Sequence, residues 1–318
     1  MKPFALTMGD PAGIGPEILI DALCTFASRP VIVFGETKII ERARALSTHP
    51  NAKSLELHII ESSLNTEFDA GVASQASGAA AIASIEAATH ACMRGECEAL
   101  ITTPISKNAL KLAGSPFPGH TEMLAHLCHH AGKARDVAMM FASDRLNVML
   151  TTIHLSLLDA INAITVHSVT RAIEHAHEAA PWLGIAKGAK PRIAVAGLNP
   201  HASEDGLFGD EEAIHILPAI AACKLRGIDV SGPYPPDTIF MRAKRGEFDI
   251  VVAMTHDHGL IAVKLDGIEH AVNVTVGLPF LRASVDHGTA YDIAWQCKAS
   301  SENLLHVLNW AHRATTHD

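Results

Sequence analysis

Short hydrophobic runs alternate along this chain with longer segments that are amphipathic or rich in Ala. The short runs stop abruptly at Gly, Pro, Asn, Asp or a polar cluster, which is typical of buried strands. Strands are predicted at residues 4–8, 30–34, 55–60, 99–103, 137–141, 148–153, 193–196 and 250–254. Helices are predicted at residues 37–46, 74–93, 166–180, 210–224, 237–245 and 300–311, with one more after Gly119 and another from Tyr291. This alternation predicts an α/β fold with mostly parallel sheets and helices on both faces.

The chain of 318 residues is long enough for two domains. No internal repeat and no low-complexity linker marks a boundary between them. We expect the chain to pass from the first domain to the second near the polar segment 132–136, and to return to the first domain near 280–290. This interpretation predicts a first α/β lobe at 1–134 plus 287–318 and a second at 135–286, with the active site in the cleft between them.

Composition and charge limit the classes of partner. Hydrophobic residues make up 48% of the chain and charged residues 19%, which favours a full core over long disordered tails. The net charge of −9 disfavours a nucleic-acid binder, because neutralising phosphates needs a basic surface. No apolar run approaches the roughly 20 residues of a membrane span, and the N-terminus lacks the apolar region of a signal peptide. The six Cys show no CxxC spacing, so we expect reduced thiols in a cytoplasmic protein.

Histidine is unusually frequent, with 20 residues, and three of them occupy equivalent positions, each just after a predicted strand. His154, His201 and His256 each follow a predicted hydrophobic strand. Parallel strands converge at their carboxyl ends, and three imidazoles that leave coordination positions open are typical of a catalytic metal site. A single His in a loop more often bonds the backbone, and His258 is a candidate fourth member. Imidazole ligands favour zinc, with magnesium or cobalt as alternatives.

The other histidines that we considered lie on predicted helices, and we expect them to face solvent. They are His126, His129, His130, His175 and His177.

Several polar residues point to a small anionic ligand. Lys264, Asn273 and Arg282 stand near apolar runs, which suits a bound anion better than a solvated surface. The loop 287–290 leads into a predicted helix and can offer backbone N–H groups to an anion. Asp257 is a candidate to orient a neighbouring metal ligand or to act as a base, although a sequence neighbour usually points elsewhere.

Two more segments carry ambiguous signals. Gly13 and Gly15 form a fragment of a dinucleotide fingerprint, and a tight turn that needs positive φ explains them equally well. His120 and Thr121 open a helix, where Thr121 either caps the helix or contacts substrate.

Taken together, the motifs resemble the 4-hydroxythreonine-4-phosphate dehydrogenase family, PdxA. The resemblance runs from residue 4 to about 297. It rests on GDPAGIGPE (9–17), TPISK (103–107), GHTE (119–122), GLNPHA (197–202), GPYPPDT (232–238) and the run from HDHG to SVDHGTA (256–290).

This resemblance implies a two-lobed fold similar to isocitrate and isopropylmalate dehydrogenases, in a homodimer with its site at the subunit interface. It implies a divalent metal held by His154, His201 and His256. From the residues themselves, His256 and Asp257 are our candidates for the catalytic centre. The implied substrate contacts are His120, Thr121, Lys264, Asn273 and Arg282. The implied contacts to NAD, with NADP as the alternative, are His287, Gly288, Thr289 and Asp292.

The implied reaction is a metal-dependent oxidation of 4-phosphohydroxy-L-threonine to the 3-oxo acid, which then loses CO2 in pyridoxal 5′-phosphate synthesis. One departure bears on the substrate, because His258 stands where the family usually has Gln. A related dehydrogenase acting on a four-carbon sugar-acid phosphate or on a dihydrodiol dicarboxylate is the alternative. A metal-dependent phosphohydrolase is the alternative from another class.

Overall fold

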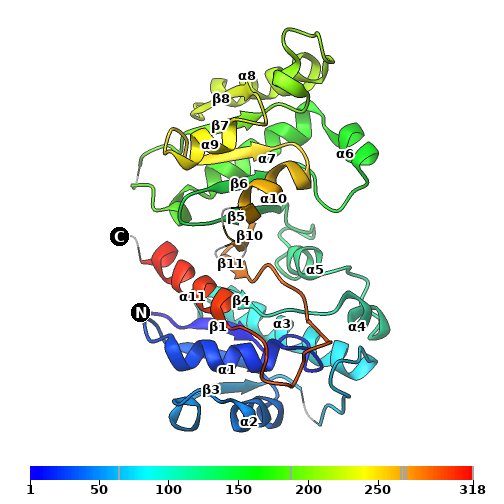
Figure 1. Cartoon of the computed structure of the whole chain (residues 1–318), viewed down its shortest axis with the longest axis vertical. Helices are drawn as coiled ribbons and strands as arrows, with labels where there is room; N and C mark the ends of the chain where they lie inside the picture. The colour runs from blue at the N-terminus through cyan, green and yellow to red at the C-terminus, as the bar shows by residue number, and fades with distance from the viewer. Residues whose placement is uncertain (64, 187, 266, 268–270, 317–318) are drawn as a thin grey trace. The chain divides into compact units, whose positions relative to one another are not determined.

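The computed structural model describes residues 1–63, 65–186, 188–265, 267 and 271–316. The chain divides into two compact units. The first comprises Met1–Asp136 and Leu278–Thr315, and the second comprises Val137–Gly277 with the C-terminal residues from Thr316. The chain passes into the second unit after Asp136, at the end of the predicted segment 132–136. It returns to the first unit after Gly277, just before the predicted range 280–290. Each unit has its own arrangement of strands and helices (Figure 1).

The first unit is built on five parallel strands in the order β3-β2-β1-β4-β11. The strands are β1 (Phe4–Thr7), β2 (Val31–Gly35), β3 (His58–Glu61), β4 (Ala99–Thr102) and β11 (Leu281–Ser284). Every residue of β1, β4 and β11 is buried, which requires cover on both faces of the sheet.

Helices supply that cover for the first unit. They are α1 (Gly15–Thr25), α2 (Thr37–Leu46), α3 (Gln75–Met93), α4 (Lys107–Leu112), α5 (His120–Leu127) and α11 (Glu302–Thr315). α3 packs against β1, β2 and β4, and α11 packs against β4 and β11 beside α1 (Figure 1). A capping box at Ser74, whose hydroxyl accepts from Ser77 N while the Ser77 hydroxyl accepts from Ser74 N, sets the start of α3.

The second unit is built on six strands in the order β10-β5-β6-β9-β7-β8. The strands are β5 (Ala138–Ala142), β6 (Asn147–Leu150), β7 (Ile193–Ala196), β8 (Val230–Tyr234), β9 (Ile250–Ala253) and β10 (Val272–Val276). β10, β5 and β6 pair antiparallel, and β6, β9, β7 and β8 pair parallel. The prediction of an α/β fold with mostly parallel sheets is therefore confirmed.

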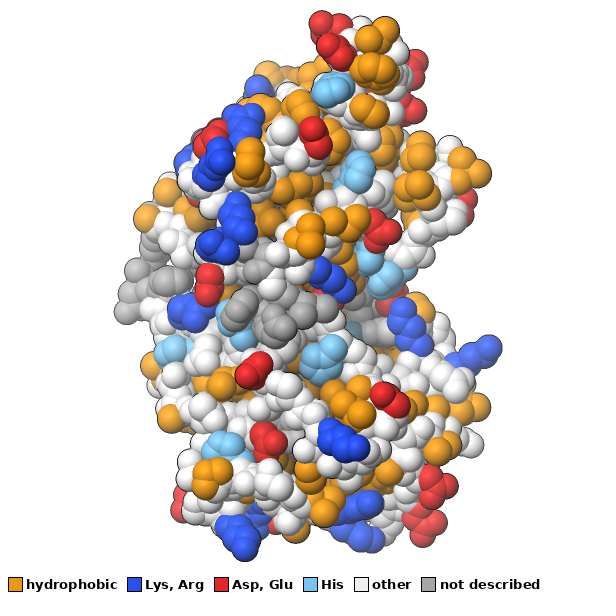
Figure 2. Space-filling view, viewed as in Figure 1, with side chains coloured by type: hydrophobic (Ala, Val, Ile, Leu, Met, Phe, Trp, Pro, Cys, Tyr) orange, Lys and Arg blue, Asp and Glu red, His pale blue; other side chains and the backbone are white. Residues whose placement is uncertain are grey.

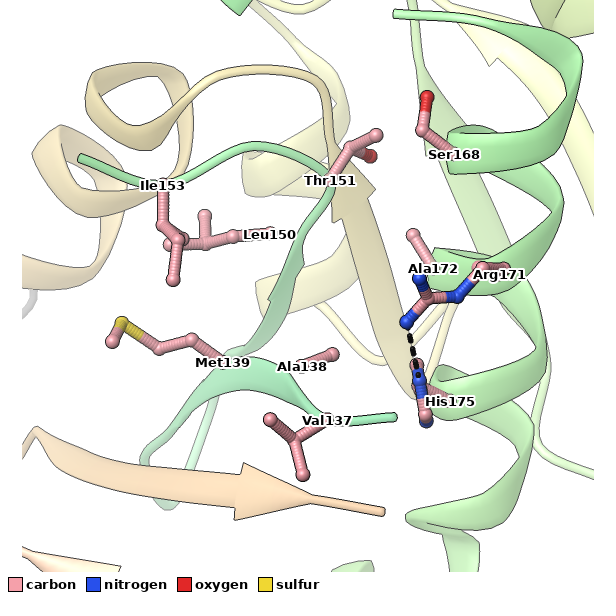
Figure 3. A pocket seen from close by; sticks show the side chains of 10 residues that line it. All are labelled: Val137, Ala138, Met139, Leu150, Thr151, Ile153, Ser168, Arg171, Ala172 and His175. Carbon is pink, nitrogen blue, oxygen red and sulfur yellow. Dashed lines mark hydrogen bonds between the residues drawn. The ribbon is translucent and has the colours of Figure 1, made fainter. Parts of the chain in front are cut away.

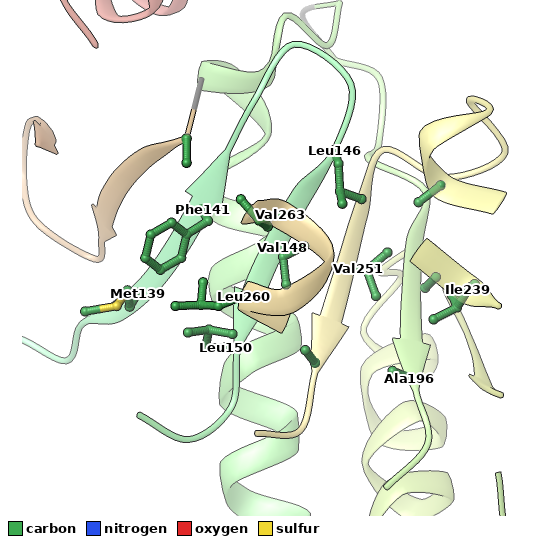
Figure 4. Packing of buried hydrophobic residues seen from close by; sticks show 14 residues of the cluster. Met139, Phe141, Leu146, Val148, Leu150, Ala196, Ile239, Val251, Leu260 and Val263 are labelled. Atoms are coloured by element: carbon green, nitrogen blue, oxygen red, sulfur yellow. The ribbon is translucent and has the colours of Figure 1, made fainter. Parts of the chain in front are cut away.

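The helices of the second unit are α6 (Leu157–Ala163), α7 (Val166–Glu178), α8 (Leu217–Leu225), α9 (Ile239–Lys244) and α10 (His256–Leu265). α7 packs against β5, β6, β7 and β9. α10 covers β6 and β9, and its Leu260 and Val263 pack on Val148 and Val251 in one buried cluster (Figure 4). Among the described residues, no helix is long and apolar enough to cross a membrane.

The predicted elements differ from the observed ones in a few places. α4, α6, α10, β8, β10 and β11 were not predicted, because these segments are short or contain polar or Pro residues that obscure a clear period. The helix predicted from Tyr291 is wrong, since this segment forms successive turns with positive φ at Trp295 and Cys297. The carboxylate of Glu17 accepts hydrogen bonds from the backbone N–H groups of both residues, which holds the turns in place. A tertiary contact therefore overrides the local preference.

The expectation that the helical histidines face solvent is wrong for His175. This side chain on α7 is only 6% exposed. Its Nδ1 lies 3.2 Å from Glu178 Oε2. The hydrogen bond to this carboxylate offsets the cost of desolvating the ring nitrogen, so His175 can be buried on the amphipathic helix.

Candidate active site

Three strand ends in the second unit carry the predicted metal ligands. β9 lies between β6 and β7, and the three strands run parallel. His154 follows β6, His201 follows β7, and His256 begins α10 directly after β9. All three histidines therefore leave the sheet at the same edge.

The backbone at two of these histidines is strained. His154 and His201 adopt left-handed conformations with φ of 51° and 53°. Such conformations cost on the order of 1 kcal/mol for residues other than Gly, and they cluster at functional sites. Around His201 the loop is held by the buried carboxylate of Glu212, whose Oε1 accepts from the N–H groups of Leu198 and Asn199 at 2.8 and 2.7 Å.

The arrangement of the three imidazoles is uneven. The rings of His154 and His256 lie with their centroids 5.8 Å apart. The ring of His201 lies 6.1 Å from the ring of Phe208. Across the part of the chain that the structure describes, no group of three or more His, Cys, Asp or Glu side chains is arranged to hold a metal ion.

Asp257 contacts the histidine that precedes it, although a sequence neighbour was expected to point elsewhere. Its Oδ1 lies 2.7 Å from Nδ1 of His256. A carboxylate on Nδ1 fixes the ring orientation and leaves Nε2 to bind a metal. The imidazoles of His154 and His256 are donors of the kind that a divalent metal such as zinc prefers.

A cavity of about 470 Å³ lies beside these residues within the second unit. It is lined by Leu198, Pro200, His201, Pro236, Asp237, Asp257, His258 and Ile261. The Nδ1 atom of His258 is buried and has no hydrogen-bond partner among the described residues. Burial lowers the pKa of His258, and the charge of Asp257 partly opposes that shift. His258 is therefore a neutral hydrogen-bonding group in the lining of this cavity near pH 7.

In the first unit, Arg282 on β11 is a buried cation. It is 2% exposed, and its Nη2 donates to Oγ1 of Thr102 on β4 at 2.7 Å. Burial lowers the pKa of Arg282 to about 9. A pKa shift of this direction means that the guanidinium lacks the hydration it would have in water, and a bound anion restores that stabilisation.

His120 begins α5 and is affected by Arg282. Burial, and to a smaller extent the charge of Arg282, lowers the pKa of His120 well below its ordinary value. The Nε2 atom of His120 is buried and has no hydrogen-bond partner among the described residues. Gly119 is the N-cap residue of α5, so Thr121 does not cap this helix. The interpretation that Thr121 caps this helix is therefore wrong.

Lys264 and Asn273, two more of the predicted substrate contacts, belong to the second unit. Lys264 lies exposed in the last turn of α10. Asn273 lies in β10, and its Oδ1 is buried without a hydrogen-bond partner among the described residues. An amide oxygen of this kind is a ready acceptor for a ligand hydroxyl or ammonium group.

The predicted cofactor loop is interlocked with the N-terminal loop of the same unit. The N–H of Ile14 donates to the carbonyl of Thr289 at 3.0 Å. A Cβ at Gly13 would lie 2.9 Å from Cβ of Thr289, so only Gly fits there. Gly13 therefore serves close packing, and the interpretation that it supplies positive φ is wrong. His287 Nδ1 lies 3.1 Å from the carbonyl of Gly288, and its buried Nε2 has no partner among the described residues.

One pair in this region was missed from the sequence. The hydroxyl of Tyr291 donates to Oδ2 of Asp10 at 2.5 Å, and Oδ1 of Asp10 accepts from the N–H of Ala12 at 2.9 Å. Burial raises the pKa of Asp10 and also that of Tyr291. A separation of 281 positions left no local signal for the pair.

Comparison with known proteins adds to this description. The chain is 47% identical to a protein from Beijerinckia indica subsp. indica named 4-hydroxythreonine-4-phosphate dehydrogenase, over 98% of this chain and 94% of the relative. It is 42% identical to D-threonate 4-phosphate dehydrogenase of Salmonella typhimurium, over 95% and 96% of the two chains. A crystal structure of 4-hydroxythreonine-4-phosphate dehydrogenase from Klebsiella pneumoniae is similar with a TM-score of 0.89 and 40% identity, covering 99% of this chain and 98% of that chain.

The fold, together with these relatives, defines an α/β oxidoreductase of the dehydrogenase class. The family can be stated more narrowly. A model described as pyridoxal phosphate biosynthetic protein PdxA matches residues 27–311, and the chain belongs to this family.

Proposed function

We propose that this dehydrogenase oxidises 4-phosphohydroxy-L-threonine with NAD, giving the 3-oxo acid and, after loss of CO2, 3-amino-2-oxopropyl phosphate. The relative that is 47% identical carries the name of this activity. The structural observation that carries the proposal is the buried guanidinium of Arg282, because the phosphate of a phosphorylated substrate is an anion that such a desolvated cation binds well. The reaction would belong to pyridoxal 5′-phosphate synthesis, as the family description indicates.

We assign the residues of this chain the following roles. Arg282 and Lys264 bind the phosphate, so that binding energy remote from the reacting carbon positions the substrate. His120, Thr121 and Asn273 contact the remaining polar groups, which fits the buried partnerless atoms of His120 and Asn273. The loop that contains His287, Gly288, Thr289 and Asp292 binds NAD, with NADP as the alternative.

We also propose a divalent metal, zinc first and magnesium or cobalt as alternatives, held by His154, His201 and His256. When bound, it supplies Lewis acidity that lowers the pKa of the substrate hydroxyl. The contact between Asp257 and His256 supports this assignment because it orients the ring for coordination. Asp257 remains our candidate for the general base.

The uneven arrangement of the histidines favours a homodimer in which each metal site takes ligands from both subunits. Leu155, Leu157 and Leu158 come directly after His154 and are 52%, 68% and 69% exposed. Figure 2 shows hydrophobic side chains on the surface over α6, the helix to which the last two belong. Large exposed apolar groups beside a metal ligand are suited to association with a second copy of the chain.

D-threonate 4-phosphate is the second candidate substrate. The Salmonella relative acts on it by name and is 42% identical. This substrate differs from the first at the carbon next to the carboxylate, where it carries a hydroxyl in place of an amine. The neutral ring of His258 in the cavity lining is a suitable partner for a hydroxyl group.

The test is to measure NADH formation with each substrate, before and after chelation and after metal is added back. We expect turnover of 4-phosphohydroxy-L-threonine that chelation abolishes and metal restores. Turnover of D-threonate 4-phosphate alone would move the protein to the second candidate. Release of inorganic phosphate without NADH would contradict the dehydrogenase and favour the phosphohydrolase.

A further inference from the structure

A second cavity, of about 160 Å³, lies in the second unit between α7 and the open end of the β5–β6 hairpin. It is lined by Val137, Ala138, Met139, Leu150, Thr151, Ile153, Ser168, Arg171, Ala172 and His175. None of these residues has a role in the function proposed above. The volume is several times the roughly 30 Å³ that one water molecule occupies in the liquid, so the cavity has room for a small organic molecule.

The two sides of this cavity differ in chemistry. Figure 3 shows Met139, Leu150 and Ile153 close together on one side and Arg171 with His175 on the other. The first group is aliphatic, and the second group presents a guanidinium from α7. A ligand that matches both sides has a short hydrocarbon part and one anionic end.

The charge of Arg171 is held in position by its neighbours. Its Nη2 lies 3.5 Å from Nε2 of His175 (Figure 3). Nδ1 of His175 lies 3.2 Å from Oε2 of Glu178. Burial lowers the pKa of His175, which keeps the ring neutral so that Nε2 can accept from Arg171 while Nδ1 donates to Glu178. Glu174, the other carboxylate of this helix near His175, is ion-paired with Arg226.

A second polar group points to a ligand. The Oγ1 atom of Thr151 is buried and has no hydrogen-bond partner among the described residues. A buried hydroxyl without a partner is costly, and a carboxylate in this cavity would accept from it. The Ser168 hydroxyl is already used at the start of α7, where it donates to the carbonyl of Ala163 and accepts from Thr165 N at 2.9 Å each.

We propose that this cavity binds a short-chain aliphatic carboxylate, with the carboxylate on Arg171 and Thr151 and the hydrocarbon part against Met139, Leu150 and Ile153. The ligand would lie next to the chain that carries a proposed metal ligand, because His154 directly follows Ile153. Occupancy of the cavity therefore restrains the segment that leads from β6 to His154.

The experiment is a calorimetric titration of the full-length protein with 3-methylbutanoate. We expect saturable binding of one molecule per chain, and no binding of the uncharged 3-methylbutanamide, which has nearly the same shape. Arg171→Met should weaken binding roughly tenfold or more, because a charge-assisted contact is lost. Thr151→Val, which keeps the shape of the side chain, should weaken it several-fold.

Arg94→Met is the matched control, since it removes an exposed Arg of the first unit whose partner is Glu96. This variant should bind 3-methylbutanoate as the original chain does. Thermal melts of each variant check that it is folded, and Thr151→Val provides a second test if Arg171→Met melts early.

Three results would overturn the proposal. The first is no binding of 3-methylbutanoate by folded protein, and the second is binding of the amide as tight as that of the carboxylate. The third is that folded Arg171→Met and folded Thr151→Val both bind 3-methylbutanoate as tightly as the original chain does. Binding of inorganic phosphate in place of the carboxylate would also contradict the aliphatic half of the assignment.

Discussion

Nη2 of Arg282 and Oγ1 of Thr102 are joined by a hydrogen bond of 2.7 Å inside the first unit, between neighbouring parallel strands. The bond orients a guanidinium that is almost completely buried. Burying a cation costs free energy that neutral hydrogen bonds recover only in part. The buried guanidinium of Arg282 therefore contributes to anion binding at a cost to the free energy of unfolding. Substitution of Arg282 can separate these two effects.

We predict that Arg282→Met raises KM for the phosphorylated substrate roughly 100-fold, while the midpoint of thermal unfolding stays the same or rises. The physical reason is that Met removes the phosphate contact and also the desolvated charge. Steady-state kinetics and a thermal melt measure the two effects. Arg282→Lys should not restore KM, because an ammonium cannot reproduce the planar guanidinium contacts. An unchanged KM for the phosphorylated substrate in Arg282→Met would show that Arg282 does not bind this substrate.

Metal content tests the three histidines. We predict that His154→Ala, His201→Ala and His256→Ala each lose bound metal after dialysis. Asp257→Asn should keep the ligands but weaken metal affinity about 10- to 100-fold, because the amide no longer holds the His256 ring as a carboxylate does. Elemental analysis at a defined free metal concentration measures this series.

His167→Gln is the control for the metal series, since His167 is an exposed residue of α7. Its metal content should match that of the original chain. Full metal content in His201→Ala would show that His201 is not a ligand in any subunit arrangement.

The pair of Asp10 and Tyr291 tests the cofactor loop. We predict that Tyr291→Phe raises KM for NAD about tenfold with little change in kcat, because the hydrogen bond to a carboxylate contributes about 1.5–3 kcal/mol to holding the loop. Asp10→Asn should act in the same direction, and the double variant should be less than additive. Tyr234→Phe, at the only other Tyr, is the matched control in the second unit. Additive effects would show that the two residues act independently.

Stability should depend on pH through His120. Its pKa is lowered well below the ordinary 6.5, so below pH 6.5 the unfolded chain binds a proton that the native chain does not. Stability therefore falls as the pH decreases from about 6.5 toward the lowered pKa, by at most about 1.4 kcal/mol per pH unit for one group. We predict that His120→Asn flattens part of this fall in melts recorded across that range. His175 and His258 contribute in the same direction, so some pH dependence should remain.

Much of the fold could be predicted because its signals are local. Val31–Gly35, Ile193–Ala196 and Ile250–Ala253 are hydrophobic enough to be recognised as buried strands, and Gln75–Met93 has a clear helical start at Ser74. The position of each candidate metal ligand after a strand follows from the same runs. These features depend on residues within a few positions of one another.

The errors arise where distant residues decide the conformation. The turns at Trp295 and Cys297 replace a predicted helix because Glu17 binds their backbone N–H groups. Gly13 is required by Thr289, which lies far along the chain. His175 is buried because Glu178 and the packing of α7 on the sheet satisfy it.

The amino-acid sequence by itself determined the α/β class, the family motifs and the residues available for chemistry, because strand and helix signals are written in short-range patterns of polarity. Only the tertiary structure decided which of those residues meet. It joined Arg282 to Thr102 and Asp10 to Tyr291, brought the rings of His154 and His256 together, and opened a cavity at Arg171. Contacts between distant segments depend on how the sheet orders its strands, and strand order is set by packing and not by any local sequence pattern.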